Sequence, residues 1–409
     1  MLHVVSKDPR RGARSVVLMS ESEDEADVVV VGGRSAGAAT AMLLGRLGHR
    51  VTVVERSRIP SDTLSTHGIA RGGVVQLARW GLLDRVLASG APCLREVLFR
   101  AGDAEEVRTV RPRAGVDGLI APRRHILDGI LAEAAVGAGA RFRTGLTAHA
   151  LIRGGDGRVR GVRARSTDGE QVSLPARIVV GADGVRSRMA VLCGSAVRES
   201  YPADNATFYL YVGGTSWPRL EYHAGELASG HTGFAGVFPT HGGEACVWVC
   251  CPAPMVAGVR GGAVESFFRL LASVSPSLAA RARAGRVTSR VRGAVRLPNQ
   301  IRRATGPGWA LVGDAGCHRD PITGHGITDA FRDAELLAGG IDAYLCGDVV
   351  DLSGYETARD AALRETFDIT CAMSRYPPLP EFAELQLRLG RALNTEADHL
   401  ASLPWTVTA

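Results

Sequence analysis

The stretch at residues 27–55 reads DVVVVGGRSAGAATAMLLGRLGHRVTVVE. Residues 28–31 form the continuous apolar run that a parallel strand covered on both faces requires. Gly32 permits a tight turn, and Gly37 permits the following helix to pack close to the strand. The order of strand, glycine turn, helix and second strand predicts a βαβ unit of a doubly wound α/β sheet. The N–H groups at the start of its helix are placed to bind a phosphate.

Two residues refine this prediction. Glu55 ends the second strand, where an acid accepts hydrogen bonds from ribose hydroxyls. Arg34 takes the place of the middle glycine of a GxGxxG turn, so its side chain must point away from the ligand or lie beside a diphosphate as a cation. With a strand before it, a helix after it and Glu55 behind, the turn predicts a dinucleotide site. A purely structural βαβ turn is the alternative.

The composition is that of a soluble globular protein. The 409 residues are 45% hydrophobic and 22% charged, and the formal net charge is +6. Lys7 is the only lysine, and the arginines are scattered among 42 acids without a basic stripe. We therefore expect no nucleic-acid partner. No apolar run reaches the ~18 residues of a membrane span, and no signal peptide or zinc spacing is visible. We expect a cytoplasmic protein with a disordered extension over residues 1–25.

Two later stretches complete a set of three motifs. Residues 180–187 read VGADGVRS after a buried strand, and residues 311–329 read LVGDAGCHRDPITGHGITD. Together with the first stretch they resemble the fingerprints of the FAD-dependent aromatic hydroxylases. These are the class A flavoprotein monooxygenases, with geranylgeranyl-reductase-like relatives. Order and spacing match over about residues 26–345, and the third motif is the most specific.

The resemblance implies an α/β architecture with a three-layer Rossmann-type FAD-binding domain, an inserted, mainly antiparallel β-sheet and a helical C-terminal tail. The FAD-binding domain is expected from residues 26–92, 120–193 and 290–349, the substrate-binding sheet from residues 93–119 and 194–289, and the C-terminal helices from residues 350–409.

The resemblance also assigns roles. Asp314 would bind a ribityl hydroxyl of FAD, with a turn-capping Asp as the alternative. Pro321 would lie against the flavin ring, and the N–H groups that follow would face its N1/O2 edge, where a helix points its positive end. Arg124 would contact FAD, with a surface arginine as the alternative. The full set of expected FAD contacts is Gly32, Gly33, Arg34, Ser35, Ala36, Gly37, Glu55, Arg124, Asp183, Gly313, Asp314, Pro321, Gly324, His325, Gly326 and Ile327.

The histidines give one catalytic candidate. His67 lies in a loop after the second strand, where active-site contact and simple loop hydrogen bonding are both consistent with the pattern. His318 is displaced by one residue from the histidine of many hydroxylases, so we expect no catalytic role for it. We find no metal-ligand spacing and predict no metal site.

Residues 201–255 are rich in aromatic and β-branched residues and predict antiparallel strands. Tyr209 and Tyr211 share one face at a period of two. We expect the sheet to cover the flavin and to line a large apolar pocket. For any single residue, ordinary sheet core is the alternative. The expected substrate contacts are Tyr209, Tyr211, Phe234, Phe238 and Trp248.

The resemblance implies a choice between reactions. A monooxygenase uses NAD(P)H as a transient co-substrate and O2, and a flavin C4a-hydroperoxide then hydroxylates or epoxidises the substrate in a dry pocket. We expect this reaction on a small apolar substrate of secondary metabolism, such as antibiotic biosynthesis, with a separate flavin reductase as an optional partner. A halogenase would need a lysine at the substrate, and only Lys7 exists.

Two alternatives stay open. One is a geranylgeranyl-reductase-like ene reductase or dehydrogenase, whose aromatic turn the stretch GFAGVFP at residues 233–239 distantly resembles. The other is a non-catalytic flavin-binding protein.

Overall fold

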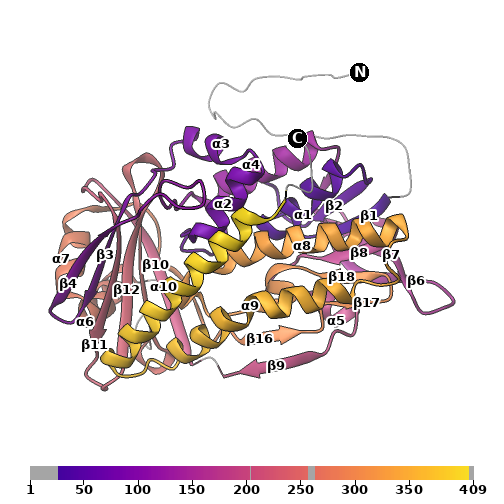
Figure 1. The fold of residues 1–409 in the computed structure, drawn as a ribbon. Coiled ribbons are helices and arrows are strands. Elements are labelled where there is room, and N and C mark those ends of the chain that lie inside the picture. The colour runs from indigo at the N-terminus through magenta and orange to yellow at the C-terminus, as the bar shows by residue number, and fades with distance from the viewer. Residues whose placement is uncertain (1–25, 203, 257–262, 405–409) are drawn as a thin grey trace.

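The computed structural model describes residues 26–202, 204–256 and 263–404 (Figure 1). The expected N-terminal extension, residues 1–25, lies outside the described residues. No helix in the described part of the chain is long and apolar enough to cross a bilayer.

The first sheet is built on parallel strands from distant parts of the chain. Its order is β17-β18-β8-β1-β2-β5, with β17 the antiparallel edge. The strands are β1 (Ala26–Val31), β2 (Val51–Glu55), β5 (Arg141–Thr144), β8 (Gln171–Gly181), β17 (Thr305–Gly306) and β18 (Trp309–Leu311). β6 (Leu146–Arg153) and β7 (Val159–Ser166) form an antiparallel meander with β8. The sequence-predicted βαβ unit is therefore the centre of this sheet.

Helices cover one face of this sheet. Val28 and Val30 pack against them, whereas Val29 and Val31 face the meander and α5 (Arg188–Leu192). Both sets are buried, which explains why the strand reads as an unbroken apolar run. The covering helices are α1 (Ser35–Arg46), α2 (Arg71–Arg79), α3 (Leu83–Ala88), α4 (Arg124–Gly137) and α8 (Gly326–Cys346).

The second sheet is mainly antiparallel, in the order β14-β10-β13-β12-β11-β3-β4, with β15 beside β10. One face packs on α6 (Val264–Val274) and α7 (Pro276–Ala284). Tyr209 and Tyr211 lie on the other face, as predicted. The strands are β3 (Glu96–Ala101), β4 (Ala104–Thr109), β10 (Asn205–Gly213), β11 (Leu220–Glu226), β12 (Thr232–Pro239), β13 (Ala245–Pro252), β14 (Arg286–Val287) and β15 (Arg292–Val295).

The C-terminal part joins the two sheets. A small third sheet contains β9 (Val197–Tyr201), β16 (Asn299–Arg302) and β19 (Cys317–His318). α9 (Ser353–Met373) follows, and α10 (Leu379–Ser402) runs from the second sheet up to α2 (Figure 1). The expected fold class, α/β with an antiparallel sheet and C-terminal helices, is confirmed.

Candidate active site

Three turns from distant parts of the chain meet at the carboxyl ends of β1, β8 and β18. A Cβ atom on Gly32 would lie 2.3 Å from the carbonyl oxygen of Ala182, and one on Gly37 would lie 1.8 Å from that of Gly32. One on Gly313 would lie 2.9 Å from the Cβ atom of Ala36. The three turns are therefore in direct contact, and only glycine permits this close approach.

A buried carboxylate holds two arginines at the start of α1. Asp128 of α4 accepts hydrogen bonds from the Ser35 hydroxyl at 2.9 Å, from Arg34 at 3.2 Å and from Arg124 at 3.0 Å. The Arg34 guanidinium also donates to the carbonyl oxygen of Ser61 at 3.0 Å. Two guanidinium groups and one carboxylate leave a net positive charge beside the free N–H groups of α1. This is the environment that binds a diphosphate.

Two of the expected cofactor contacts use their carboxylates within the protein. Glu55 is buried and accepts a hydrogen bond from the backbone N–H of Gly33 at 2.8 Å. Asp183 accepts from the Ser187 hydroxyl at 2.5 Å and from the Met189 N–H at 3.0 Å. The side chain of Asp183 thus stabilises the start of α5, a role that the sequence motif did not predict.

Asp314 differs from both. It lies in the short 3-10 helix η3 (Gly313–Ala315), and no hydrogen bond or ion pair joins its carboxylate to another residue of the described chain. Its side chain is exposed, and burial by the surrounding protein raises the pKa of its carboxyl. A Cβ atom on Gly326 would lie 3.9 Å from an Asp314 oxygen. The carboxylate is therefore free to accept a ligand hydroxyl at the first turn of α8.

The loop before α8 has open space in front of it. It contains the 3-10 helix η4 (Pro321–Thr323) and Gly324, which has the left-handed φ of 63°. A Cβ atom on Gly324 would meet nothing within 4 Å. Open space in front of the loop and the positive end of α8 fit the electron-rich edge of a flavin ring.

The His325 side chain is buried and points away from this space, toward Glu396 of α10. Its Nε2 atom lies 2.9 Å from Oε2 of Glu396. Burial raises the pKa of Glu396, but the charges of His325 and Arg332 outweigh it and bring the pKa to about 2. His325, Asp329 and Glu396 stand close enough to hold a metal ion. Arg319 and Arg332 already pair with Asp329, which makes the group an ion-pair network.

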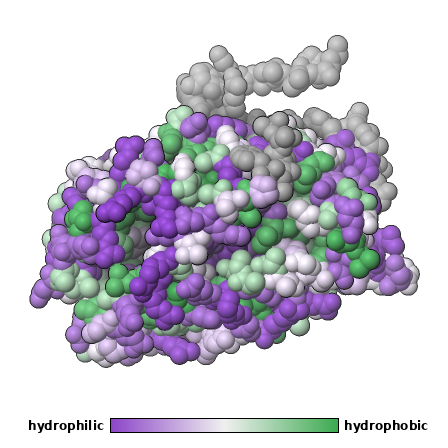
Figure 2. Space-filling view, viewed as in Figure 1, coloured by the Kyte–Doolittle hydropathy of each residue, from purple (hydrophilic) through white to green (hydrophobic). Residues whose placement is uncertain are grey.

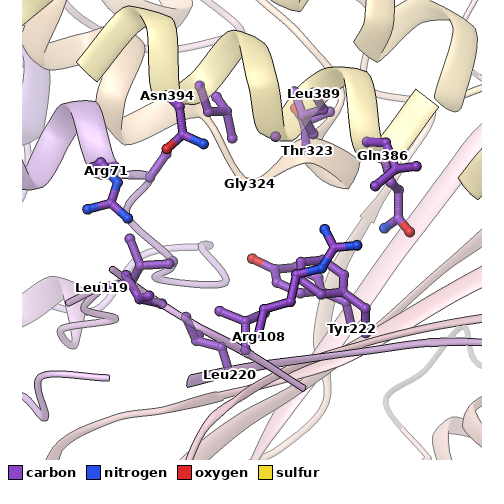
Figure 3. Close-up of a pocket in the computed structure, with 18 of the residues that line it drawn as sticks. Arg71, Arg108, Leu119, Leu220, Tyr222, Thr323, Gly324, Gln386, Leu389 and Asn394 are labelled. Carbon is purple, nitrogen blue, oxygen red and sulfur yellow. The ribbon is translucent and has the colours of Figure 1, made fainter. Parts of the chain in front are cut away.

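A cavity of about 910 Å³ opens beside the loop (Figure 3). β3, β4 and β11 form one wall and α10 forms the opposite wall (Figure 3), and Ile322, Thr323 and Gly324 also line the cavity. Much of the lining is hydrocarbon or aromatic, including Phe99 and Tyr222. The sequence did not indicate that α10 supplies a wall, because its residues are far from the three motifs.

Of the five aromatic residues expected to touch the substrate, two line the cavity and three do not. Phe234 and Phe238 line the cavity, whereas Trp248 packs against both from behind, with ring centroids 5.1 and 5.4 Å away. Tyr209 and Tyr211 are buried and point toward the loop around residues 63–67. Period two correctly predicted that Tyr209 and Tyr211 share one face of the sheet but not which part of that face the cavity reaches.

His67 lies directly behind the cavity wall. It is 1% exposed and has a φ of 70°, and its Nε2 atom shares a hydrogen bond with the Tyr211 hydroxyl. Burial lowers its pKa well below the usual range, with help from Arg124 and Arg123, so the imidazole is neutral. The next residue, Gly68, lines the cavity. The structure shows hydrogen bonds of His67 to Ser65 and Tyr211, and a catalytic role for His67 stays a prediction.

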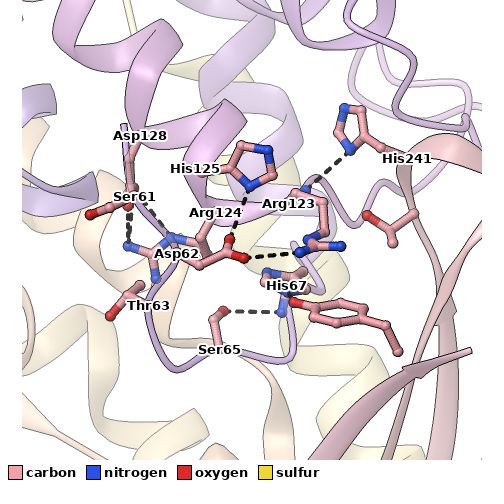
Figure 4. A network of polar contacts seen from close by, with 12 residues as sticks. Ser61, Asp62, Thr63, Ser65, His67, Arg123, Arg124, His125, Asp128 and His241 are labelled. Carbon is pink, nitrogen blue, oxygen red and sulfur yellow. Dashed lines mark hydrogen bonds and ion pairs between the residues drawn. The ribbon is translucent and has the colours of Figure 1, made fainter. Parts of the chain in front are cut away.

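Arg123 ties this region together (Figure 4). Its guanidinium lies 3.7 Å from the centre of the Tyr211 ring and forms ion pairs with Asp62 and Glu244, both at 2.9 Å. Asp62 also accepts from His125 at 2.9 Å. The network joins the loop that follows β2 and the start of α4 to the second sheet.

Asp320, which precedes η4, should make the stability of the protein depend on pH. It is buried, one oxygen accepts from the Ile322 N–H at 2.8 Å, and the other has no partner among the described residues. Burial raises its pKa to about 7, against 3.8 in an exposed carboxyl. The folded protein therefore retains a proton that the unfolded chain releases, and stability falls as the pH rises from about 4 to about 7.

Asp320→Asn cannot ionise and should abolish this loss. We expect the variant and the wild type to have the same Tm near pH 4. At pH 8 the variant should have the higher Tm, and its unfolding free energy should be larger by about 2 kcal/mol or more. Thermal melts of the FAD-free proteins across this range measure the difference. If the stabilities of the variant and the wild type change with pH in the same way, Asp320 does not titrate in this range.

Comparison with known proteins decides the family. The model for the FAD binding domain family matches residues 25–370. The chain belongs to this family. A digeranylgeranylglycerophospholipid reductase of Methanothrix thermoacetophila is 31% identical over 81% of this chain and 82% of its own. Squalene epoxidase 2 of Arabidopsis thaliana is 26% identical over 78% of this chain and 54% of its own. The structure of Pseudomonas aeruginosa PqsL with 2-aminobenzoylacetate is 25% identical, with a TM-score of 0.73 and coverage of 89% and 100%.

This member of the FAD binding domain family is a FAD-dependent oxidoreductase of the class A flavoprotein superfamily. Membership sets aside the interpretation as a non-catalytic flavin-binding protein. The residues present fit the cofactor on three independent points. These are the cationic group at α1, the Asp314 carboxylate without a partner among the described residues, and the open loop at Gly324.

Proposed function

We propose that this FAD-dependent oxidoreductase is a monooxygenase. It takes electrons from NADH or NADPH and inserts one oxygen atom of O2 into an apolar substrate, by hydroxylation or epoxidation. The squalene epoxidases among its relatives support oxygen transfer to an apolar substrate. The structure of PqsL with 2-aminobenzoylacetate supports a small organic molecule as the substrate. A substrate of secondary metabolism would suit the pocket.

The observation that carries the proposal is the cavity next to the flavin loop. Ile322 and Gly324 belong both to the loop and to the cavity lining, so a substrate in the cavity would lie next to the ring. FAD supplies the redox chemistry, because its ring accepts hydride and passes electrons to O2. The apolar walls around Phe99 and Phe234 exclude water from the reacting atoms, which oxygen transfer requires.

Other residues of the chain position the cofactor. The cationic cluster at Asp128 would hold the diphosphate, and Asp314 would hold the ribityl chain. The N-terminus of α8 would direct its positive end at the ring and stabilise negative charge there. Glu396 fixes His325, and with it the first turn of α8, through the 2.9 Å ion pair.

Turnover under isotopically labelled O2 tests the proposal. The purified, FAD-loaded protein is given NADH or NADPH together with a polyprenyl alcohol or a polyprenoic acid such as farnesoic acid, and the product is analysed by mass spectrometry. Incorporation of one labelled oxygen atom is the expected result. A product with a saturated double bond and no label would contradict it.

An ene reductase is the second candidate, and a specific observation favours it. The relative with 31% identity is a reductase. Saturation of an alkene needs a proton as well as a hydride, and Tyr222 lines the cavity with a hydroxyl that can supply one (Figure 3). Burial raises the pKa of Tyr222 to about 12, so this hydroxyl remains protonated at neutral pH.

Tyr222→Phe distinguishes the two reactions. Tyr222 stacks between Phe99 and Phe234, with centroids 5.4 and 5.9 Å away, so phenylalanine preserves the packing. We expect the monooxygenase rate of the variant to stay within about threefold of the wild type, because oxygen transfer needs no proton from this residue. General acid catalysis contributes about 100-fold or more. A fall of that size in kcat for a saturated product would identify a reductase.

A further inference from the structure

The cavity wall carries more positive than negative charge. Within the described part of the chain, six arginines and two glutamates line it: Arg71, Arg100, Arg108, Arg111, Arg113, Arg391, Glu105 and Glu106. In the view of Figure 2, hydrophilic residues gather on the face that α10 crosses. An apolar cavity with an excess of guanidinium groups is unusual for a site that takes only hydrocarbons, because each unpaired charge near low-dielectric walls is costly.

Half of these arginines are neutralised by neighbouring acids. Arg100 pairs with Glu105, Arg108 with Glu106 at 2.6 Å, and Arg113 with Asp398. These pairs use both glutamates of the lining.

The other three have no carboxylate partner among the described residues. They are Arg71, Arg111 and Arg391. The only hydrogen bond from the Arg71 side chain to a described residue is a long one, 3.4 Å, to the carbonyl oxygen of Val116. Its guanidinium lies in the cavity across from Asn394 of α10 (Figure 3).

The environment of Arg71 favours a negatively charged ligand. Burial lowers the pKa of its guanidinium, and the charge of Arg113 lowers it further. Asp398 opposes this effect but is bound to Arg113. An anion in the cavity would relieve both the burial and the repulsion, and a bidentate carboxylate or phosphate matches guanidinium geometry best.

We propose that the cavity binds an anionic amphiphile. Its apolar body lies against Phe99, Tyr222 and Phe234, and its carboxylate or phosphate group pairs with Arg71, with Arg391 and Arg111 adding positive charge at the rim. This inference rests on the proposed function in one respect, which is that the substrate binds in this cavity. It adds the class of substrate, which is a long apolar chain with an acidic end rather than a neutral hydrocarbon.

Binding of three matched probes tests this proposal. Farnesol, farnesoic acid and farnesyl phosphate share one apolar body and differ in the end group. They are titrated calorimetrically into the FAD-loaded protein without NAD(P)H. We expect the two anions to bind about tenfold or more tightly than the alcohol, and this preference to shrink as salt is raised. A stronger preference for the phosphate would indicate a phosphorylated lipid, and one for the acid would indicate a carboxylic acid. Equal affinity for all three would overturn the proposal.

Variants assign the effect to the cavity. Arg71→Gln and Arg391→Gln should reduce the preference for the anions while the affinity for farnesol is unchanged. Arg163→Gln, on the exposed side of β7, is the matched control and should behave as wild type. A preference that survives in both cavity variants would overturn the assignment, as would a loss of FAD affinity in Arg71→Gln without any change in preference. Because no turnover is measured, the result is independent of whether oxygen is transferred.

Discussion

The Asp314→Ala protein is expected to fold as the wild type does but to bind FAD about 100-fold more weakly. The Asp314 carboxylate is exposed and has no hydrogen-bond partner among the described residues, so its removal breaks no contact within the described chain. A hydrogen bond to a charged group is worth about 1.5–3 kcal/mol, and about 3 kcal/mol corresponds to 100-fold in Kd. Titration of the FAD-free protein by flavin fluorescence measures the affinity, and a thermal melt measures the fold.

Asp183→Ala is the matched comparison. Its carboxylate accepts two hydrogen bonds at the start of α5, so the variant should lose about 1–2 kcal/mol of stability. Asp314→Ala should lose affinity without stability, and Asp183→Ala should lose stability. An Asp314→Ala protein with a Kd within threefold of the wild type would contradict the position that we give to the ribityl chain.

Gly37→Ala should have the second large effect. The added Cβ atom would lie 1.8 Å from the Gly32 carbonyl oxygen and 3.1 Å from the Ala182 side chain. Neither backbone can yield without separating α1 from β1 and β8, so we expect an insoluble protein or one without bound FAD. Solubility and the flavin absorbance of the purified protein are the measurements.

Gly339→Ala provides the control for this substitution. Gly339 is an exposed residue inside α8, and a Cβ atom there would meet nothing within 4 Å. Alanine favours a helix over glycine by about 0.5–1 kcal/mol, so this variant should be slightly more stable than the wild type. A Gly37→Ala protein that binds FAD normally would show that the approach of the three turns is not essential.

The first βαβ unit could be predicted because its information is local. The apolar run at residues 28–31 indicates a strand that is buried on both faces. Gly32 and Gly37, in the same short stretch, indicate where backbones approach closely. The three motifs could also be grouped, since their order and spacing resemble a known family. Their meeting in one place is now visible from contacts such as that between Gly313 and Ala36.

The contacts between distant side chains could not be predicted. Nothing near Arg34 in the sequence indicates that Asp128 would hold it, or that Glu396 would pair with His325. The same holds for the cavity. Its second wall comes from α10, so the sequence alone could not show that Phe234 lines it while Tyr209 does not.

A crystal structure of the FAD-loaded protein tests the central claim most directly. We predict the diphosphate at the N-terminus of α1 beside Arg34 and Arg124, the ribityl chain at Asp314, and the ring along η4 and Gly324 with one face toward the cavity. Density for FAD elsewhere, or a ring separated from the cavity by Ile322 and Thr323, would contradict the account.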